Sequence, residues 1–428
     1  MDKNFVIQGD ICWSKAPNAL ETRPDSFLVC IEGKSAGVFP RLPDQYASLP
    51  LCQCSGKLVI PGLVDLHTHA PQFAFRGLGM DLELLDWLAT HTFPEEAKYR
   101  NLEYARTAYK LFVEHLKRGP NTRIVVFATV HVPATLALMD LLEESGLVSM
   151  VGKVNMDRNC PDTLREENAA ISLNATREWL AAYAARTGNY SGTRPILTPR
   201  FIPSCSDELM RGLGALRRTM NLPVQSHLSE SRKEIEWVKT LCPSSEGYGA
   251  AYRDFDLFGS EEESAPTVMA HCVWSDEKEI ALMARRGVFA AHCPQSNANL
   301  SSGIAPVRQL IDAGVSVGLG SDIAAGANSS IFRAMSDAIQ ASKLRQQPLT
   351  LEEAFCCGTA GGGAFFGKAG MGFSGSFDPG NDFDALVIDD GDIAAPFELS
   401  IRNRLERAVY TSDSRHIEAK YVRGLRLK

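Results

Sequence analysis

The chain has 428 residues, of which 45% are hydrophobic and 22% charged, and its formal net charge is -7. This length is too great for one small domain and suits a barrel with a modest accessory domain. A mildly acidic chain gains nothing from attraction to a phosphate backbone, so nucleic acid is not an expected partner. The chain has eleven cysteines without a pattern of disulfide pairing, and its N-terminus is polar. It also lacks a long apolar run, so we predict a cytoplasmic protein that does not engage a membrane.

The middle of the chain alternates apolar runs, rich in Val, Ile, Leu or Ala, with longer amphipathic segments. Runs of this kind are typical of strands that are buried on both faces of a parallel sheet. We predict eight such strands, at residues 57–67, 123–129, 149–155, 194–201, 222–228, 267–272, 288–293 and 315–322.

The amphipathic segments between the strands predict helices at 84–93, 102–119, 163–188, 206–221, 231–242 and 275–287. Ser275 is the expected N-cap of the last helix and Gly287 its expected end. Eight strands with intervening helices predict a closed parallel (β/α)₈ barrel of the TIM type. A doubly wound open sheet is the alternative, but no glycine-rich phosphate loop follows any predicted strand.

The two ends of the chain differ from this middle part in their pattern. Residues 1–57 and 375–428 contain short strand-like runs separated by turn residues. Neither end could bury a core alone, so we predict that both fold together as one small β-rich domain beside a barrel of residues 58–374. The strand-like runs lie at 4–9, 26–33, 382–389, 405–411 and 418–424.

Histidines stand where predicted strands stop. His67 and His69 are alternate residues at the end of the first strand, so both face the C-terminal mouth of the barrel. Five of the nine histidines of the chain share this position, and an acid ends the eighth strand. Separate structural histidines are the alternative, but the coincidence favours a metal site for zinc or iron. Besides His67 and His69, the residues at the ends of predicted strands are His227, His271, His292 and Asp322.

A metal ion at such a site predicts hydrolytic chemistry. The ion lowers the pKa of a water from about 15.7 towards roughly 7, which supplies a hydroxide nucleophile. Glu230 lies three residues after His227 and can move the proton, although an acid at a helix N-terminus is the structural alternative. No Cys-x-x-Cys and no His-Glu-x-x-His occurs, which argues against the small cytidine-deaminase fold and against zincin peptidases.

The run from Pro61 to Glu96 resembles the metal-binding segment of guanine deaminases in the amidohydrolase superfamily. Later blocks, including TPRF, QSHLSES, VMAHC, AHCPQSN and VGLGSD, resemble those of the family in the same order, over roughly residues 58 to 365. The resemblance implies deamination of guanine to xanthine and ammonia by a metal-activated hydroxide, in a homodimer with one zinc or iron ion per subunit.

The resemblance also implies the roles of individual residues. His271 would position the water, Glu230 would carry a proton to a ring nitrogen, and Asp322 would help to accept a proton from the water. Binuclear relatives have a carboxylated lysine at the end of the fourth strand, where this chain has Arg200 instead. The single ion would be held by His67, His69, His227 and Asp322.

The family's base-recognition motifs map onto two parts of this chain. A guanidinium or an amide donor suits O6 of guanine, and an aromatic face suits a flat base. For Gln72 and Arg200, solvent-facing polarity or a structural salt bridge is the alternative. Two positions are open for the aromatic side chains Phe73, Phe75 and Trp87, which either line the pocket or belong to the core. For His292 the alternatives are contact with the substrate and support of the site. The mapped substrate-binding residues are Ala70, Pro71, Gln72, Arg200, Phe201 and His227.

Two other functions remain open from the sequence. The same chemistry could act on a related ring, such as 8-oxoguanine, a pterin or an aminotriazine. A catalytically dead amidohydrolase-like scaffold is a second alternative, but such proteins lose metal ligands, and this chain retains all of them together with Glu230.

Overall fold

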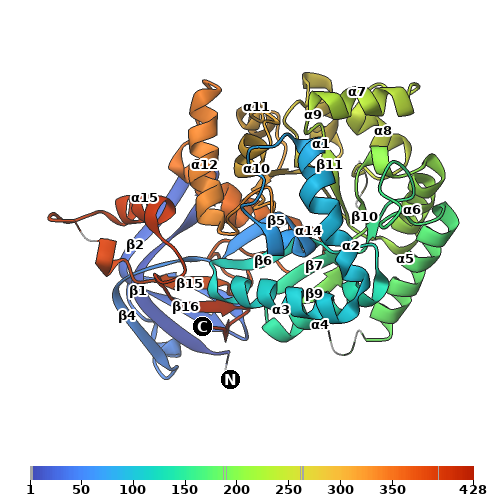
Figure 1. Ribbon diagram of the computed structural model, residues 1–428. Coiled ribbons are helices and arrows are strands. Elements are labelled where there is room, and N and C mark those ends of the chain that lie inside the picture. The colour runs from blue at the N-terminus through green and yellow to red at the C-terminus, as the bar shows by residue number, and fades with distance from the viewer. Residues whose placement is uncertain (1–2, 187, 189, 261, 263–264, 394) are drawn as a thin grey trace.

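A closed barrel of parallel strands forms the centre of the molecule (Figure 1). The computed structural model describes residues 3–186, 188, 190–260, 262, 265–393 and 395–428. Its eight-stranded sheet has the order β11-β12-β13-β14-β5-β6-β7-β9, and every pairing is parallel. A parallel bridge between Leu197 and Val224 joins the segment after β9 to β11, which closes the sheet and confirms the predicted barrel.

The barrel strands are short and almost entirely buried, as their apolar composition predicts. Two further pieces, β8 (Val154–Asn155) and β10 (Thr198–Pro199), pair with each other just after β7 and β9. The barrel strands are β5 (Leu63–His69), β6 (Asn121–Phe127), β7 (Val148–Gly152), β9 (Thr193–Pro195), β11 (Val224–Leu228), β12 (Thr267–His271), β13 (Phe289–His292) and β14 (Val317–Leu319).

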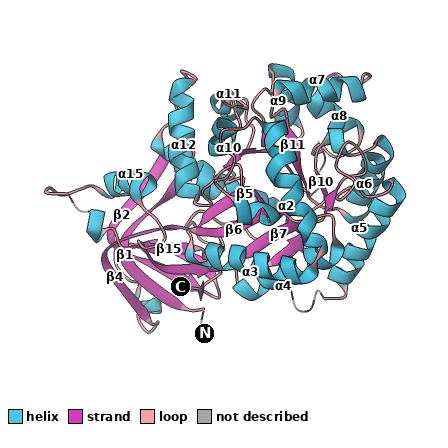
Figure 2. Ribbon diagram, viewed as in Figure 1, coloured by secondary structure: helices cyan, strands magenta, loops and turns pink. Residues whose placement is uncertain are grey.

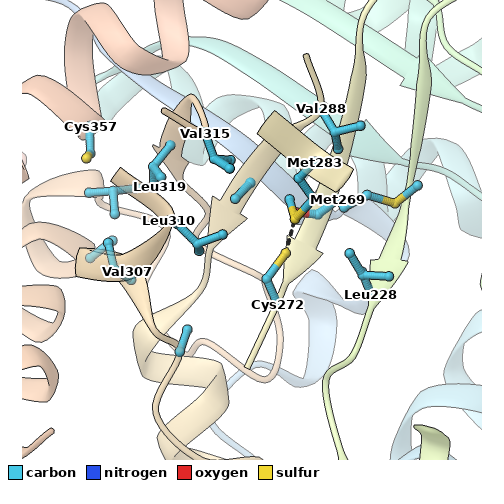
Figure 3. Packing of buried hydrophobic residues seen from close by; sticks show 14 of the residues in the cluster. Leu228, Met269, Cys272, Met283, Val288, Val307, Leu310, Val315, Leu319 and Cys357 are labelled. Carbon is cyan, nitrogen blue, oxygen red and sulfur yellow. Dashed lines mark hydrogen bonds between the residues drawn. The ribbon is translucent and has the colours of Figure 1, made fainter. Parts of the chain in front are cut away.

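Helices surround the barrel strands (Figure 2). Figure 3 shows how the core forms between the layers: Leu228 of β11 and Met269 of β12 lie with Met283 of α9 in one hydrophobic cluster. Within the described ranges, no helix has the length and apolar composition that a membrane span requires. The helices around the barrel are α3 (Leu102–Arg118), α4 (Val132–Ser145), α5 (Ala169–Ala184), α6 (Asp207–Met220), α7 (Arg232–Leu241), α8 (Tyr248–Asp254), α9 (Glu277–Arg285), α10 (Pro294–Asn299), α11 (Val307–Asp312), α12 (Ile331–Leu344), α13 (Leu351–Cys356) and α14 (Gly362–Lys368).

The predicted helices are present, but some of their ends differ. The N-cap of α9 is Asp276, whose side chain accepts a backbone N–H of the first turn, so the prediction of Ser275 was wrong by one residue. The helix predicted at 163–188 begins only after its N-cap, Asn168, and residue 187 lies outside the described part of the chain. The segment predicted at 84–93 forms α1 (Leu84–Trp87) and a π-helical turn, and α2 (Phe93–Ala97) continues it.

Three predicted strands are each divided in two, and one of them is the run 149–155, which forms β7 and then β8. The run 57–67 contains the end of β4 (Leu51–Pro61) and the start of β5, which belong to different sheets. The joint is Gly62, where a Cβ atom would lie 2.3 Å from the side chain of Thr122, so only glycine lets the strands approach. The run 194–201 is divided between β9 and β10 because its two prolines cannot donate to a strand ladder.

The two chain ends form one mixed sheet beside the barrel, with the order β17-β16-β15-β4-β1-β2-β3 (Figure 1). Because β15 pairs antiparallel with β4, segments from opposite ends of the sequence are neighbours, which confirms that the ends fold together. The boundaries at residues 57 and 375 stay a prediction. The strands of this end sheet are β1 (Phe5–Ala16), β2 (Ala19–Ile31), β3 (Lys34–Phe39), β4, β15 (Ala385–Ile388), β16 (Ile417–Val422) and β17 (Leu425–Arg426).

The strand-like run at 405–411 is helical, so that prediction was wrong. It belongs to α15 (Ile401–Thr411), which is capped by the Ser400 side chain. Leu405, Ala408 and Val409 are the buried residues of this helix, and their spacing of three and four is the helical period. The period becomes clear only when the preceding turn, which carries the cap, is included.

A buried ionic network joins the barrel to the end sheet. The Arg123 side chain on β6 is fully buried and donates through Nε to Asp384 at 2.6 Å and through Nη2 to Asp382 at 2.7 Å. Its Nη1 donates to the carbonyls of Met371 and Gly372 at 3.1 and 2.8 Å. Both aspartates directly precede β15, so one guanidinium fixes the C-terminal strands against the barrel.

We expect Arg123→Met to lower the free energy of unfolding by about 3–5 kcal/mol, because the buried Asp384 loses its cation, whereas Asp382 keeps ion pairs with Lys34 and Arg423. Arg402→Met is the control, since Arg402 pairs with Glu352 on the surface and its loss costs less than about 1 kcal/mol. Urea unfolding followed by circular dichroism measures both variants. Equal small losses would contradict a structural role for the network.

Candidate active site

Imidazoles from three strands and one carboxylate meet at the mouth of the barrel. Nε2 of His69 lies 3.2 Å from Nε2 of His67 and 3.3 Å from Nε2 of His227. Oδ1 of Asp322, just after β14, lies 3.2 Å from His67 Nε2 and 3.5 Å from His69 Nε2. On the far side, His271 places its Nε2 3.8 Å from Oδ2 of Asp322. The structure therefore brings together four of the five predicted histidines and the predicted aspartate, whereas His292 makes none of these contacts.

Hydrogen bonds to the outer nitrogens orient two of these rings. Nδ1 of His227 lies 2.6 Å from the carbonyl oxygen of Arg200, and Nδ1 of His271 lies 2.9 Å from Oδ1 of Asn297. Because both oxygens are acceptors, Nδ1 carries the proton in each ring. In neutral His227 the Nε2 lone pair then points into the cluster, which is the arrangement of a metal ligand.

Electrostatics also favours the ligand form of these groups. Burial lowers the pKa of His67, His69 and His227, so these imidazoles are neutral. Burial alone would raise the pKa of Asp322, but the neighbouring imidazoles outweigh it and hold that pKa well below its usual value. Burial opposes the charge of His271 as well, yet its carboxylate neighbours raise its pKa overall.

The donor set fits a metal ion. Neutral Nε2 atoms that face each other at 3.2 and 3.3 Å cannot all be satisfied by hydrogen bonds among themselves. In a tetrahedral site with bonds of about 2.0–2.1 Å, ligand atoms lie about 3.3–3.4 Å apart, close to the spacing observed here. Three groups of side chains can each bring one ligand atom within 4.8 Å of the others, and two of them consist only of the predicted residues.

The backbone around the cluster adopts costly conformations. Asp322 and His271 have φ angles of 47° and 73°, in the left-handed region that non-glycine residues avoid. Each such residue costs of order 1–3 kcal/mol and persists only where its surroundings hold it. The N–H of Asp322 donates to the carbonyl of His67 at 2.9 Å, which ties β14 to β5 at this point. The strained residues are thus the ones that turn their side chains into the cluster.

Glu230 lies directly beside the cluster, after the end of β11. Its Oε2 is 3.5 Å from His271 Nε2, its Oε1 accepts from Ser302 Oγ at 3.4 Å, and its backbone N–H donates to Glu234 at 3.0 Å. Burial raises the pKa of Glu230 to about 7, against the opposing effect of His271. A carboxyl group with such a pKa can both accept and donate a proton near neutral pH.

The cluster opens into a cavity that contains many of the predicted base-binding residues. Gln72, Arg200, Phe201 and His227 line it, as does Trp87. The other lining residues are His69, Leu84, Leu85, Leu88, Glu230, Glu234, Trp237, His271, Leu300, Asp322 and Ala325.

Several residues singled out from the sequence lie behind the cavity wall. Ala70 and Pro71 are buried in the same 3₁₀ turn as Gln72. Phe73 packs on Phe112 with ring centroids 5.5 Å apart, and Phe75 packs on Trp87 at 5.4 Å. His292, at the end of β13, is buried, and burial lowers its pKa to about 3, so it is neutral.

Sequence reasoning missed several members of the cavity. Glu234 belongs to a capping box with Ser231, and the Ser-x-x-Glu spacing could have placed it in the first turn of α7 beside Glu230. Trp237 follows on the same helix and meets Phe201 edge-on, with ring centroids 6.3 Å apart. Glu96, the last residue of the run from Pro61 to Glu96, lies behind the cavity wall and bonds to both predicted donors, Gln72 and Arg200.

A closed parallel barrel with a histidine–aspartate cluster at its mouth is the arrangement of a metal-dependent barrel hydrolase. The model of the amidohydrolase family matches residues 58–424. The chain belongs to the amidohydrolase family, as the resemblance of its motifs implied.

The relatives of the chain include several guanine deaminases. It is 38% identical to guanine deaminase of Dictyostelium discoideum, covering 87% of this chain and 83% of the relative. It is 36% identical to the human guanine deaminase, covering 85% of this chain and 82% of the relative. A crystal structure of guanine deaminase from C. acetobutylicum with bound guanine is 44% identical, covers 99% of both chains and superposes with a TM-score of 0.93.

We expect His69→Asn to abolish stoichiometric metal binding, because its Nε2 stands between those of His67 and His227. His115→Asn is the control, since this exposed histidine bonds to Ser329, outside the cluster. Elemental analysis by plasma mass spectrometry gives the metal content per chain. The same content in both variants would remove His69 from the ligand set.

Proposed function

We propose that this protein catalyses the hydrolytic deamination of guanine, in which water and guanine give xanthine and ammonia. One observation carries the proposal: a metal-competent cluster and the buried Glu230 face the same cavity as Gln72, Arg200 and Phe201. The cavity thus combines a site for activating water with donors and an aromatic face for a flat base. The relatives named guanine deaminase support this choice of base.

The proposal assigns zinc as the resident ion, one per chain. His69 is central to the ligand set because its Nε2 is near three other donor atoms. When bound, the ion lowers the pKa of a water from about 15.7 towards about 7. The ligands are His67, His69, His227 and Asp322.

The protein's own side chains orient the water and move its protons. His271, fixed by Asn297, holds the water through Nε2 and directs it towards C2 of the base. Glu230 accepts a proton at Oε2 and delivers it to a ring nitrogen, while Oδ2 of Asp322 takes up a second proton. The bond from water oxygen to C2 forms, Asp322 passes its proton to the exocyclic nitrogen, the bond from C2 to that nitrogen breaks, and the nitrogen leaves as ammonia.

Recognition of the base falls to the opposite side of the cavity. Arg200 and Gln72 present N–H donors that suit the O6 acceptor of guanine, and the Phe201 ring offers a flat apolar face. Ala70 and Pro71 act indirectly, by forming the turn that carries Gln72. The apolar side chains of α1 and Trp237 exclude water from the bound ring.

The resemblance to guanine deaminases supports two further parts of the proposal, a cytoplasmic location and a homodimeric assembly. A dead scaffold is disfavoured because the described chain keeps a complete donor set next to Glu230.

We expect guanine to release ammonia with a kcat/KM at least about tenfold above melamine, which lacks the oxygen acceptor that Arg200 and Gln72 suit, above a pterin, which is larger than a purine, and above 8-oxoguanine, which adds an oxygen. Coupled detection of ammonia measures each base under the same conditions. A faster related ring would replace guanine in the proposal, and no release from any ring would favour the scaffold.

We expect Glu230→Gln to keep its metal and to lose about 10²–10⁴-fold in kcat, because an amide cannot move the proton. Glu236→Gln on α7, the helix that follows Glu230, is the control, since its side chain is exposed. Steady-state kinetics together with metal analysis separate the two effects. Unchanged kcat in Glu230→Gln would exclude this residue from the mechanism.

We expect a chelator to abolish activity and zinc to restore it, since the donor set lies close to the tetrahedral spacing that zinc prefers. Iron(II) added under anaerobic conditions to the same apoprotein is the comparison. If iron restores more activity per bound ion than zinc, the assignment of zinc is wrong.

A further inference from the structure

Glu96 connects the two donors that face the base. It lies on α2, in the segment after β5, and its side chain is only 4% exposed. Its Oε2 accepts from Nη1 of Arg200 at 2.6 Å, and its Oε1 accepts from Nε2 of Gln72 at 2.9 Å. One carboxylate therefore holds both side chains, although it is itself behind the cavity wall.

The first consequence concerns charge. The Arg200 side chain is 5% exposed, and within the described ranges Glu96 is the carboxylate that forms an ion pair with it. A buried guanidinium without a counter-ion is costly, and it would attract an anion into the cavity. With Glu96 in place, the pair is neutral overall, and an uncharged ring can bind without leaving a charge unpaired.

The second consequence concerns direction. Because Nε2 of Gln72 donates to Glu96, the amide cannot flip, and its Oε1 accepts from the N–H of Ala324 at 3.2 Å. The acceptor of the amide is thus used within the protein, whereas its second N–H remains for a ligand. Glu96 uses only one Nη of Arg200, which leaves further guanidinium N–H groups on the cavity side.

We propose that Glu96 is a specificity-determining positioning residue, which makes the cavity select a neutral planar ring with an acceptor oxygen and reject planar anions. It acts through Arg200 and Gln72 and need not touch the substrate. The proposal rests on the proposed function for the identity of the ring. The preference for neutral over anionic ligands follows from the ion pair alone.

Glu95 provides a matched control within the same helix. Its side chain is also mostly buried, at 9% exposed, but it accepts from Lys98 at 2.6 Å and from the hydroxyl of Tyr104. Neither partner lines the cavity. Glu95→Gln and Glu96→Gln therefore make the same chemical change in neighbouring residues, and only one of them contacts the donors.

The first arm of the test measures guanine turnover in the metal-loaded protein. We expect Glu96→Gln to raise KM about tenfold or more and to change kcat less, because the donors lose their positions while Glu230 and the metal cluster remain. Glu95→Gln should leave both constants within about twofold. Metal content and thermal midpoint, measured for each variant, show whether the fold is intact.

The second arm measures binding of benzoate, a planar carboxylate, by quenching of tryptophan fluorescence, since Trp87 and Trp237 line the cavity. We expect Glu96→Gln to bind benzoate about tenfold more tightly than the wild-type protein, because Arg200 then lacks a counter-ion. Glu96→Asp keeps the charge, so it should raise KM for guanine without this gain in benzoate affinity. Glu95→Gln should bind benzoate as the wild type does.

The two arms separate failure of this inference from failure of the proposed function. If guanine is not a substrate, the first arm measures no turnover. The benzoate affinities still test the role of Glu96 in that case. Equal benzoate affinity in the wild type and in a folded Glu96→Gln protein would overturn the inference. So would a gain of the same size in Glu95→Gln. If Glu96→Gln does not fold, Glu96→Asp decides, because tight benzoate binding by that variant contradicts charge neutralisation.

Discussion

The main constraint on this molecule is the close approach of three imidazole nitrogens. They lie at hydrogen-bonding distance from one another but have too few protons to share. The Nε2 atoms of His67, His69 and His227 face each other at 3.2 and 3.3 Å, and the lone pair of His227 Nε2 points into the cluster, where a cation can bind. The barrel supplies the rigidity that keeps them there, because each histidine ends a buried strand whose neighbours are hydrogen-bonded on both sides. The left-handed backbone at Asp322 and His271 is a consequence, since the turns must aim side chains at one point.

Arg200 links the two halves of the cavity. Its carbonyl oxygen orients the imidazole of His227, while its guanidinium pairs with Glu96 and faces the space for a base. The proposed water activation and the proposed base recognition therefore both depend on Arg200, just after β10. A shift of this residue would disturb a proposed metal ligand and a proposed base contact together. The Arg200 side chain is almost fully buried, and its ion pair with Glu96 leaves further guanidinium N–H groups for the cavity.

Much of the fold could be predicted because its signals are local. Apolar runs located the barrel strands, and period-two alternation placed His67 and His69 on one face. Predictions failed where packing overrides local pattern. The apolar run 57–67 has the pattern of one strand, yet at Gly62 the chain leaves the end sheet and enters the barrel sheet. The apolar residues of 405–411 read as a strand until the cap at Ser400 shows their helical period.

The sequence by itself determined which side chains could bind a metal, since strand ends can be recognised one at a time. Only the tertiary structure decided which residues surround the base. Glu96 and Trp237 come from helices that follow different strands, and their approach to Arg200 and Phe201 depends on how the barrel closes. Phe73 packs on Phe112 behind the cavity wall, and His292 is buried without lining the cavity. Contacts between distant segments leave no periodic trace in a single sequence, because the energy that selects them arises only when the layers pack.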